Sequence, residues 1–568
     1  MCSIQPNKKH LKAKFYLRFF NRYTTMKKLL LLLLTFTLLS CQNKIEADLL
    51  ILNATIYTVD DEFGKYEAMA IKDGKVLALG NSDELQERYI AKKKIDLDGK
   101  FVYPGFIDAH AHLYGLGQNL RQVDLKETQS YDEIVQRIVD YQKKNNADFI
   151  LGRGWDQNDW ENKEFPTKDT LDQLFPDTPV ALTRIDGHAY LVNQKALDMA
   201  GIDKNTTADG GEIIKNDGEL TGVLIDNPMS MINAIIPKAT EDQVKENLKK
   251  AEQYAFQYGL TSVVDAGLPG NIIESIEEMH QSGELDIRIY AMVANNKQDV
   301  DYYLEKGIIQ KPKLSVRSIK VYADGALGSR GAVLQDPYSD QPDHYGKMLI
   351  SVEDFKNVAQ KVADSEYQMN THAIGDSANA VVLRTYDKLL KDKPNRRWRV
   401  EHAQVLDASL YDYFSKNIIP SVQPTHATSD MYWAEDRLGE KRIQHAYAYK
   451  KLLDKAGILP LGTDFPVEQV NPLLTFYAAV SRKDESGYPE DGFQPENAIS
   501  RKEALKGMTI WAAYANFEEE VKGSLEVGKY ADFVVFDQDI MQIPMKEIPE
   551  LTVEATYLDG KRVYSGSE

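Results

Sequence analysis

The sequence predicts an α/β fold: a (β/α)8 (TIM) barrel with an inserted subdomain after its first strand and a composite β-sandwich from both chain ends. Strand-like runs alternate with charged helical runs through the middle of the chain. Both ends carry short strand-like runs with Asp-Gly turns, and the segment after the first barrel strand is far too long for one helix. Eight strand–helix alternations favour a closed barrel, whose chemistry lies at the carboxyl ends of its strands.

Residues 1–45 differ from the rest of the chain. The stretch MKKLLLLLLTFTLLSC runs from Met26 to Cys41, with two lysines, a short apolar core and a terminal cysteine. The core is too short for a stable transmembrane helix, and no amphipathic pattern follows that would favour a buried helix. The stretch resembles a bacterial lipoprotein signal, so we expect lipid attachment at Cys41 in the cell envelope. By resemblance to lipoprotein sorting rules, Gln42 favours the outer membrane. The mass of the mature N-terminus would test maturation at Cys41.

The two β-rich ends flank the barrel domain. Residues 46–103 form the first half of the predicted β-sandwich, with a tight turn at Asp73-Gly74. Residues 509–568 contain a final helix and the second half, with a similar turn at Asp559-Gly560. The barrel domain covers residues 104–508, and its insertion, about 113–240, is expected to lie over the barrel mouth.

The predicted barrel strands are bounded by charged helical segments such as residues 241–259 and 352–367. The eight predicted strands are 101–110, 260–267, 287–295, 315–325, 367–373, 397–404, 417–424 and 457–464.

Composition excludes several classes of partner and chemistry. The net charge of −18 over 568 residues argues against nucleic acid or an anionic membrane surface as partner. We therefore expect a small molecule as substrate. The lipid would be the only attachment to a membrane, and a homodimer is possible. Cys2 and Cys41 are the two cysteines, so maturation at Cys41 would exclude thiol nucleophiles and cysteine zinc sites.

Two histidines stand close together in the run YPGFIDAHAHL. Positions i and i+2 of a strand point to the same face, so His110 and His112 lie side by side, with Asp108 one step earlier. Two imidazoles on a buried face need a shared partner. The choice lies between a metal ion, which histidine commonly binds, and a hydrogen-bonded pair in a polar core.

Further candidate ligands fall at the ends of later predicted strands. A histidine or aspartate at a strand end is usually structural, but six such groups at one end of a barrel indicate a metal centre. The six groups are His110, His112, Lys320, His372, His402 and Asp464.

At these positions the chain resembles the amidohydrolase superfamily, and within it the YtcJ-like metal-dependent hydrolases related to N-substituted formamide deformylase. The resemblance covers most of residues 48–565. Its motifs are PGFIDAHAHL, IDGHAYLVN, IKVYADGALGSR, THAIGD, EHAQ, SVQPTHATSD and GTDFPVEQVNPL. It implies one divalent ion held by His110, His112 and Asp464, a second held by His372 and His402, and a carboxylated Lys320 as the bridge.

The resemblance also implies the reaction, hydrolysis of an amide or formamide-like C–N bond by metal-activated water. Asp464 would take the proton of that water and pass it to the leaving nitrogen. Zinc is the expected metal, although manganese, iron and cobalt accept the same ligands. A lactone or ester hydrolase uses the same site. A deaminase usually has a glutamate near the histidine of strand five, which THAIGD lacks, and the complete ligand set opposes a catalytically silent binding lipoprotein.

The remaining candidates each have a structural alternative. Lys320 is either the bridge or a solvated strand-end charge, because a lysine needs a depressed pKa before it can add CO2. His188 faces substrate by resemblance or lies in the core, and Trp155 lines a pocket or packs internally. Asp324 and Arg330 orient a polar group or pair with each other. Asp376 and His426 are expected to position other site residues or to fix loops.

Overall fold

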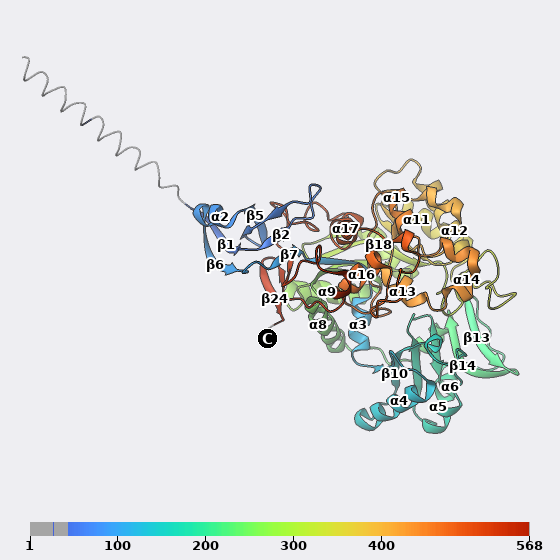
Figure 1. Ribbon diagram of the computed structural model, residues 1–568. Helices are drawn as coiled ribbons and strands as arrows, with labels where there is room; N and C mark the ends of the chain where they lie inside the picture. The colour runs from blue at the N-terminus through green and yellow to red at the C-terminus, as the bar shows by residue number, and fades with distance from the viewer. Residues whose placement is uncertain (1–26, 28–43, 567–568) are drawn as a thin grey trace, which may run out of the picture.

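The computed structural model describes residue 27 and residues 44–566 (Figure 1). These residues form four β-sheets with helices packed around the largest one. Among them, no helix combines the length and the apolar character that a membrane span requires. Cys41, the predicted lipidation site, lies outside the described residues, as does the rest of the predicted signal apart from Lys27.

The largest sheet holds seven parallel strands that follow one another in space in their sequence order. Parallel strands require crossover connections, and helices supply them here, as in a TIM-barrel-like domain. A two-residue strand, β17 (Ile309–Gln310), pairs antiparallel with β18 at the side. The seven strands are β8 (Phe106–Ala111), β15 (Leu260–Leu268), β16 (Arg288–Ala294), β18 (Leu314–Tyr322), β19 (Gln368–Ala373), β20 (Trp398–His402) and β21 (Ile418–Ser421).

The helices around this sheet are amphipathic and capped. In α8, Thr240 and Gln243 form a capping box at the N-terminus, and buried Val244 and Leu248 lie one turn apart on the inner face. The principal helices of this layer are α8 (Glu241–Gln257), α9 (Gly270–Ser282), α10 (Lys297–Lys306), α11 (Val352–Ala363), α12 (Asp376–Leu390), α15 (Tyr449–Ala456), α16 (Pro472–Ser481), α17 (Arg501–Gly507) and α18 (Ile510–Ala515).

The segment predicted as the eighth strand, residues 457–464, is not a regular strand. Leu461 forms a single parallel bridge with Val422, directly after β21. The carbonyl oxygen of Leu461 also accepts a hydrogen bond from the N–H of Ala109 in β8, at 3.1 Å. The segment therefore connects the last strand of the sheet to the first through backbone hydrogen bonds.

The prediction of one continuous strand over residues 101–110 is wrong. The chain changes sheets at Gly105: β7 (Phe101–Pro104) pairs antiparallel with β22 (Phe533–Phe536), whereas β8 belongs to the large parallel sheet. A Cβ atom at Gly105 would lie 2.3 Å from the hydroxyl oxygen of Thr261. Glycine is therefore needed where the backbone crosses β15.

Two further sheets form a β-sandwich, and one of them combines strands from both ends of the chain. Leu49 and Met69 from one sheet share an apolar cluster with Val102, Phe533 and Tyr557 from the other. The two sheets therefore pack face to face, on the left of Figure 1. One sheet contains β5 (Lys75–Gly80), β4 (Ala68–Lys72), β1 (Ile45–Leu52) and β6 (Tyr89–Asp96), and the other contains β24 (Lys561–Ser565), β23 (Ala555–Leu558), β22, β7, β2 (Thr55–Tyr57) and β3 (Lys65–Tyr66).

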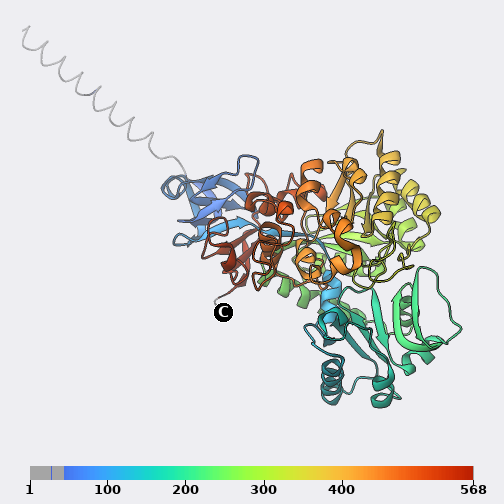
Figure 2. The same ribbon diagram turned by 45° about the vertical axis from the view of Figure 1, so that its right-hand side comes forward.

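The residues between β8 and β15 form a fourth, six-stranded sheet with its own apolar core. In Figures 1 and 2 this inserted region lies on the far side of the parallel sheet from the β-sandwich. The first helix after β8, α3 (Leu113–Asn119), packs against α8 rather than on this sheet. The sheet consists of β13 (Gly211–Asn216), β14 (Glu219–Asp226), β12 (Ala189–Val192), β11 (Val180–Arg184), β10 (Ile150–Trp155) and β9 (Val123–Asp124).

A buried ion-pair cluster connects the parallel sheet to the β-sandwich. Arg288, at the start of β16, donates from Nε to Asp532 at 2.7 Å and from Nη2 to Asp559 at 2.5 Å. Asp532 is buried, whereas the Asp559 side chain is 28% exposed. Burial opposes the charge of Arg288, but the two carboxylates raise its pKa above the ordinary range. The cluster therefore keeps a buried guanidinium charged at the junction.

We expect the substitution Asp532→Asn to destabilise the protein by roughly 3 kcal/mol, because it leaves a buried arginine without its main counter-charge. The matched control, Asp559→Asn, removes a partly exposed partner and should cost roughly 1 kcal/mol or less. The shift in the urea unfolding midpoint measures both effects. Equal shifts for the two variants would contradict the proposed dominance of Asp532.

Candidate metal centre

The predicted ligands converge at the carboxyl ends of the parallel strands. A cavity of about 830 Å3 opens there, and its walls come from the parallel sheet and from the inserted region. All six predicted metal-ligating residues line this cavity: His110, His112, Lys320, His372, His402 and Asp464.

His110, in β8, and His112, directly after β8, are each oriented by an acceptor at Nδ1. In His110, Nδ1 lies 2.6 Å from Oε2 of Glu401, and in His112, Nδ1 lies 2.9 Å from the carbonyl oxygen of Ala266. An acceptor at Nδ1 favours the tautomer that carries its proton there. This leaves the Nε2 lone pair of both rings available to a metal ion.

Asp464 is held in place by residues on both sides of it. Its backbone N–H donates to the carbonyl oxygen of His110 at 2.8 Å. Asp108 accepts hydrogen bonds from the hydroxyl and the N–H of Thr463, which precedes Asp464. At Gly462, a Cβ atom would lie 2.5 Å from the backbone nitrogen of His110, so only glycine allows this approach. The GTD motif therefore holds Asp464 against β8.

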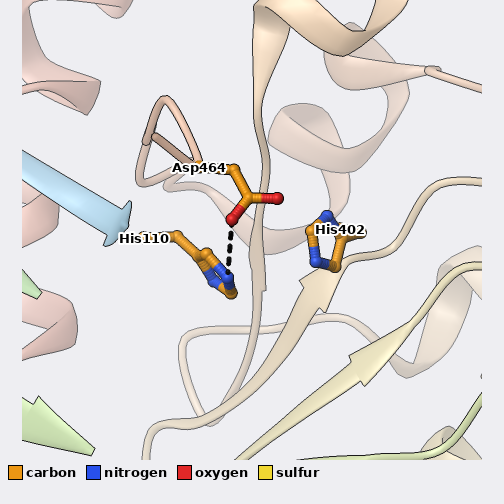
Figure 3. A group of neighbouring side chains, drawn as sticks. All are labelled: His110, His402 and Asp464. Carbon is orange, nitrogen blue, oxygen red and sulfur yellow. Dashed lines mark ion pairs between the residues drawn. The ribbon is translucent and has the colours of Figure 1, made fainter. Parts of the chain in front are cut away.

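Three ligand atoms lie within metal-binding range of one another. One ligand atom from each of His110, His402 and Asp464 falls within 4.8 Å of the other two (Figure 3). The ring of His372 adjoins this group, with its centroid 4.6 Å from that of His402. His402 and Asp464 both adopt positive φ, 71° and 63°, which is uncommon for residues other than glycine and recurs at functional sites.

The donor atoms of this cluster fit a divalent cation. Nε2 of His372 and Nδ1 of His402 are buried and have no hydrogen-bond partner within the described residues. Burying an unpaired polar nitrogen is costly, and a cation would satisfy both atoms. Burial opposes ionisation of Asp464, but hydrogen bonds from His112 and His426 hold its pKa well below the usual range. Neutral imidazoles and an ionised carboxylate are the ligand forms that zinc-type ions bind.

Lys320 is a buried amine inside this group of ligands. It is fully buried, and its Nζ lies 3.2 Å from Nε2 of His110. Burial lowers the pKa of Lys320 to about 8, so roughly a tenth of the amine is neutral at pH 7, far more than for an ordinary lysine. The alternative of a solvated strand-end charge is therefore wrong for this lysine.

Glu401 is a functional residue that sequence reasoning missed. It is fully buried in β20, between the Nδ1 of His110 and the Nε of Arg399, which lies 2.7 Å from Oε1. Burial opposes ionisation of Glu401, but Arg399 and His110 lower its pKa to about 2. The signal in the sequence was two oppositely charged residues, Arg399 and Glu401, in a strand expected to be buried, because a buried glutamate needs partners.

Of the predicted substrate residues, His188 alone lines the cavity. Its Nδ1 lies 2.6 Å from Oδ1 of Asp226, and its ring centroid is 5.3 Å from that of His372. Burial opposes the charged form of His188, but the hydrogen bond and the charge of Asp226, together with the charges of Asp186 and Asp324, raise its pKa. His188 therefore presents a ring with a polar edge beside the candidate ligands.

The other three predicted substrate residues do not line the cavity. Trp155 is buried in the core of the inserted region, where its indole N–H donates to the carbonyl oxygen of Leu182 at 2.8 Å. Asp324 is buried and accepts the backbone N–H groups that follow β19. Arg330 pairs with Asp340, so Asp324 and Arg330 do not pair with each other. Trp155 and Arg330 support the walls of the site rather than facing a substrate. Oδ1 of Asp324 lies 3.8 Å from Nε2 of His372, one of the candidate ligands.

His426 and Asp376 also have defined contacts. His426, in α13 (Pro424–Asp430), lies 3.3 Å from Oδ2 of Asp464 and 2.9 Å from Oε1 of Glu468. It lines the cavity, so it contacts the site directly. Asp376, at the first turn of α12, accepts the N–H of Gln335 and holds a loop.

This arrangement can hold a cation, polarise a substrate carbonyl and move a proton through Asp464. A family model described as the amidohydrolase family matches residues 93–564, most of the chain. The chain belongs to the amidohydrolase family. The resemblance seen in the motifs is therefore confirmed.

Individual relatives extend along nearly the whole chain of this amidohydrolase. YtcJ of Bacillus subtilis (strain 168), whose name assigns it to the amidohydrolases, is 34% identical over 523 residues, which are 90% of this chain and 98% of the relative. Protein LONG AFTER FAR-RED 3 of Arabidopsis thaliana is 33% identical over 92% of each chain. N-substituted formamide deformylase of Arthrobacter pascens is 24% identical over 90% of this chain and 97% of the relative.

A solved structure shows the same architecture. An uncharacterized metal-dependent hydrolase from Pyrococcus horikoshii OT3 superimposes with a TM-score of 0.71 and is 28% identical. The match covers 88% of this chain and 99% of the other. The protein is therefore a metal-dependent hydrolase of the amidohydrolase superfamily with a TIM-barrel-like domain.

We expect Glu401→Gln to weaken metal retention by roughly 10- to 100-fold, because the neutral amide no longer polarises His110 or compensates Arg399. Metal released to a competing chelator measures the effect. Glu518→Gln is the matched control, since Glu518 is similarly buried but pairs with Lys522 outside the cavity. Wild-type retention in Glu401→Gln would contradict the role assigned to Glu401.

Proposed function

We propose that this amidohydrolase hydrolyses an amide or formamide-like C–N bond of a small molecule. The observation that carries the proposal is the convergence of unpartnered imidazole nitrogens, a buried lysine amine and an ionised carboxylate in one cavity. A relative of nearly equal length is named N-substituted formamide deformylase, which supports C–N cleavage.

The proposed metal site contains two divalent ions, with zinc as the expected metal. His110, His112 and Asp464 would hold one ion, His372 and His402 the other, and a carboxylated Lys320 would bridge them. When bound, such a pair lowers the pKa of water and polarises a carbonyl group. The full burial of Lys320 and its contact with His110 support the bridge, because a carbamate would replace an isolated amine by an anion among cations.

Asp464 is the proposed catalytic residue. Its Oδ1 lies 3.2 Å from Nε2 of His112, and its Oδ2 lies 3.3 Å from Nε2 of His426. The contact of Oδ2 with His426 and the position of Oδ1 beside the Nε2 atoms of His110 and His112 keep the carboxylate in a fixed position as it accepts the proton of the attacking water. It then passes this proton to the leaving nitrogen, which departs as a neutral amine.

The proposal also includes closure of the parallel sheet into a barrel. The hydrogen bonds of residues 460–462 to the strands on both sides support it. In a closed barrel, Asp464 stands beside β8 and completes a ring of ligands around the mouth.

The proposed function predicts release of amine from N-formyl and N-acetyl amines by the zinc-loaded protein, at rates above those for the matched esters and lactones. The amide reaction should stop when a chelator removes the metal and resume when zinc is added back. Amine release is followed with a colorimetric reagent and acid release from esters by titration. Turnover of esters or lactones alone would refute C–N specificity.

The bridge predicts a specific defect in Lys320→Ala. Without the anion, two cations would face each other in a poorly solvated site, so at least one ion should be lost and turnover should fall by more than about 100-fold. Formate or acetate, which fit the vacated space, should restore part of both. Metal content and turnover are measured with and without the added acid.

Lys320→Met serves as the matched control, because it fills the same space without an amine and leaves less room for an added acid. Rescue of the alanine variant but not of the methionine variant supports an anionic bridge. Retention of two ions and near-normal turnover in Lys320→Ala without added acid would refute it.

A further inference from the structure

One guanidinium in the cavity has no carboxylate partner. Arg153 lies on β10 of the inserted region and lines the same cavity as the candidate metal ligands. Its Nη2 donates to the carbonyl oxygen of Ile185 at 3.0 Å, and its buried Nε has no partner among the described residues. In the described part of the chain, no carboxylate forms an ion pair with it.

By contrast, the neighbouring arginine of the cavity forms ion pairs with carboxylates. Arg184, on the adjacent strand β11, lines the cavity as well. It pairs with Asp156 and with Asp186, and its Nε donates to the side chain of Gln157 at 2.8 Å. The fold therefore supplies direct carboxylate partners to Arg184, whereas Asp186 and Asp464 act on the charge of Arg153 without forming an ion pair with it in the described residues. Arg153 is half-buried and its Nε is buried without a partner among the described residues, so a carboxylate bound in the cavity would supply the direct partner that the fold does not.

The backbone around Arg153 leaves its guanidinium uncovered. Gly187 lies beside it with φ of +77°, and a Cβ atom there would stand 3.3 Å from Nη2 and 3.4 Å from Nη1. Any side chain at this position would press on the guanidinium. Leu151, two residues earlier on the same face of β10, also lines the cavity. The strand therefore presents a cation next to an apolar surface.

We propose that Arg153 binds the carboxylate of the substrate and that the substrate class is N-acyl amino acids with an apolar side chain. The acid group pairs with Arg153 while the amide lies among the ligands at the strand ends. A planar guanidinium matches a carboxylate through two parallel hydrogen bonds. Leu151, Met229 and Ile236 line the same cavity and provide apolar contacts for the side chain.

The charges around the cavity favour a singly charged anion. Asp159, Asp430 and Glu468 also line it, and none of them forms an ion pair with an arginine or a lysine in the described residues. A doubly charged phosphate would be repelled more strongly by these carboxylates than a substrate carboxylate would. This inference rests on the proposed C–N hydrolysis and names the substrate class for that same site.

Two substrates that differ by one group test the proposal. N-acetylphenylalanine carries the carboxylate, and N-acetylphenethylamine is the same molecule without it. With zinc-loaded wild type, we expect kcat/KM to be about 10- to 100-fold higher for the acid, as for a hydrogen bond to a charged group. Arg153→Met should remove this preference by raising KM for the acid, and should leave the neutral amide within about twofold.

Two further variants separate recognition from folding. Arg153→Lys keeps the charge but loses the planar fork, so it should retain part of the preference. Arg121→Met is the matched control, because Arg121 pairs with Glu246 outside the cavity and should leave both substrates unaffected. A calorimetric titration with 3-phenylpropionate gives a readout without turnover: binding to wild type should weaken about 10-fold or more in Arg153→Met.

The outcomes distinguish the two proposals. If neither amide is hydrolysed, C–N hydrolysis of this class fails, while loss of 3-phenylpropionate binding in Arg153→Met still supports the carboxylate site. If wild type hydrolyses both amides equally, or Arg153→Met lowers both equally, the assignment of Arg153 is overturned and the C–N activity stands. Unchanged binding of 3-phenylpropionate in Arg153→Met would also overturn it.

Discussion

A buried ion pair inside the parallel sheet, Arg399 with Glu401, holds the other residues of the site in place. Arg399 contacts Glu401, the hydroxyl of Ser421 and the carbonyl oxygen of Ala109, and Glu401 in turn holds the ring of His110. These contacts connect β20 to β21 and to β8. In a poorly solvated interior each charge is stable only while its partners stay in place. These charged residues therefore fix the spacing of the three strands and the orientation of the His110 ring.

The candidate ligands and the proposed substrate contacts come from different parts of the chain. The candidate metal ligands lie on the parallel strands and on the segment that connects their two edges. Arg153 and His188 come from the inserted region, which has its own sheet and core. The inserted sheet can therefore change its lining residues without disturbing the histidines, which fits a superfamily whose members share a fold and differ in substrate.

Strand-end chemistry was predictable from the sequence, and contacts between distant residues were not. Parallel strands place their carboxyl ends together, so the positions of His110, His372 and His402 already indicated one site. Glu401 escaped notice because its importance depends on Arg399 and His110, which meet it only in the folded sheet. Trp155 was open to two interpretations because an aromatic residue on a strand fits a core or a cavity equally well, and its neighbours decide. The break at Gly105 depends on Thr261, 156 positions later, where no local pattern marks it.

The chain ends meet in one sheet, and this has a consequence for synthesis. Strand β7 lies between β2 and β22, and β22 begins at Phe533, close to the end of the chain. While the ribosome makes the intervening residues, β7 exposes an unpaired edge, which is a template for aggregation. The β-sandwich begins to emerge from the ribosome before the other domains, and it is therefore the last domain to be completed. A nascent chain of this protein has to be kept from associating with its neighbours until its final strands have left the ribosome.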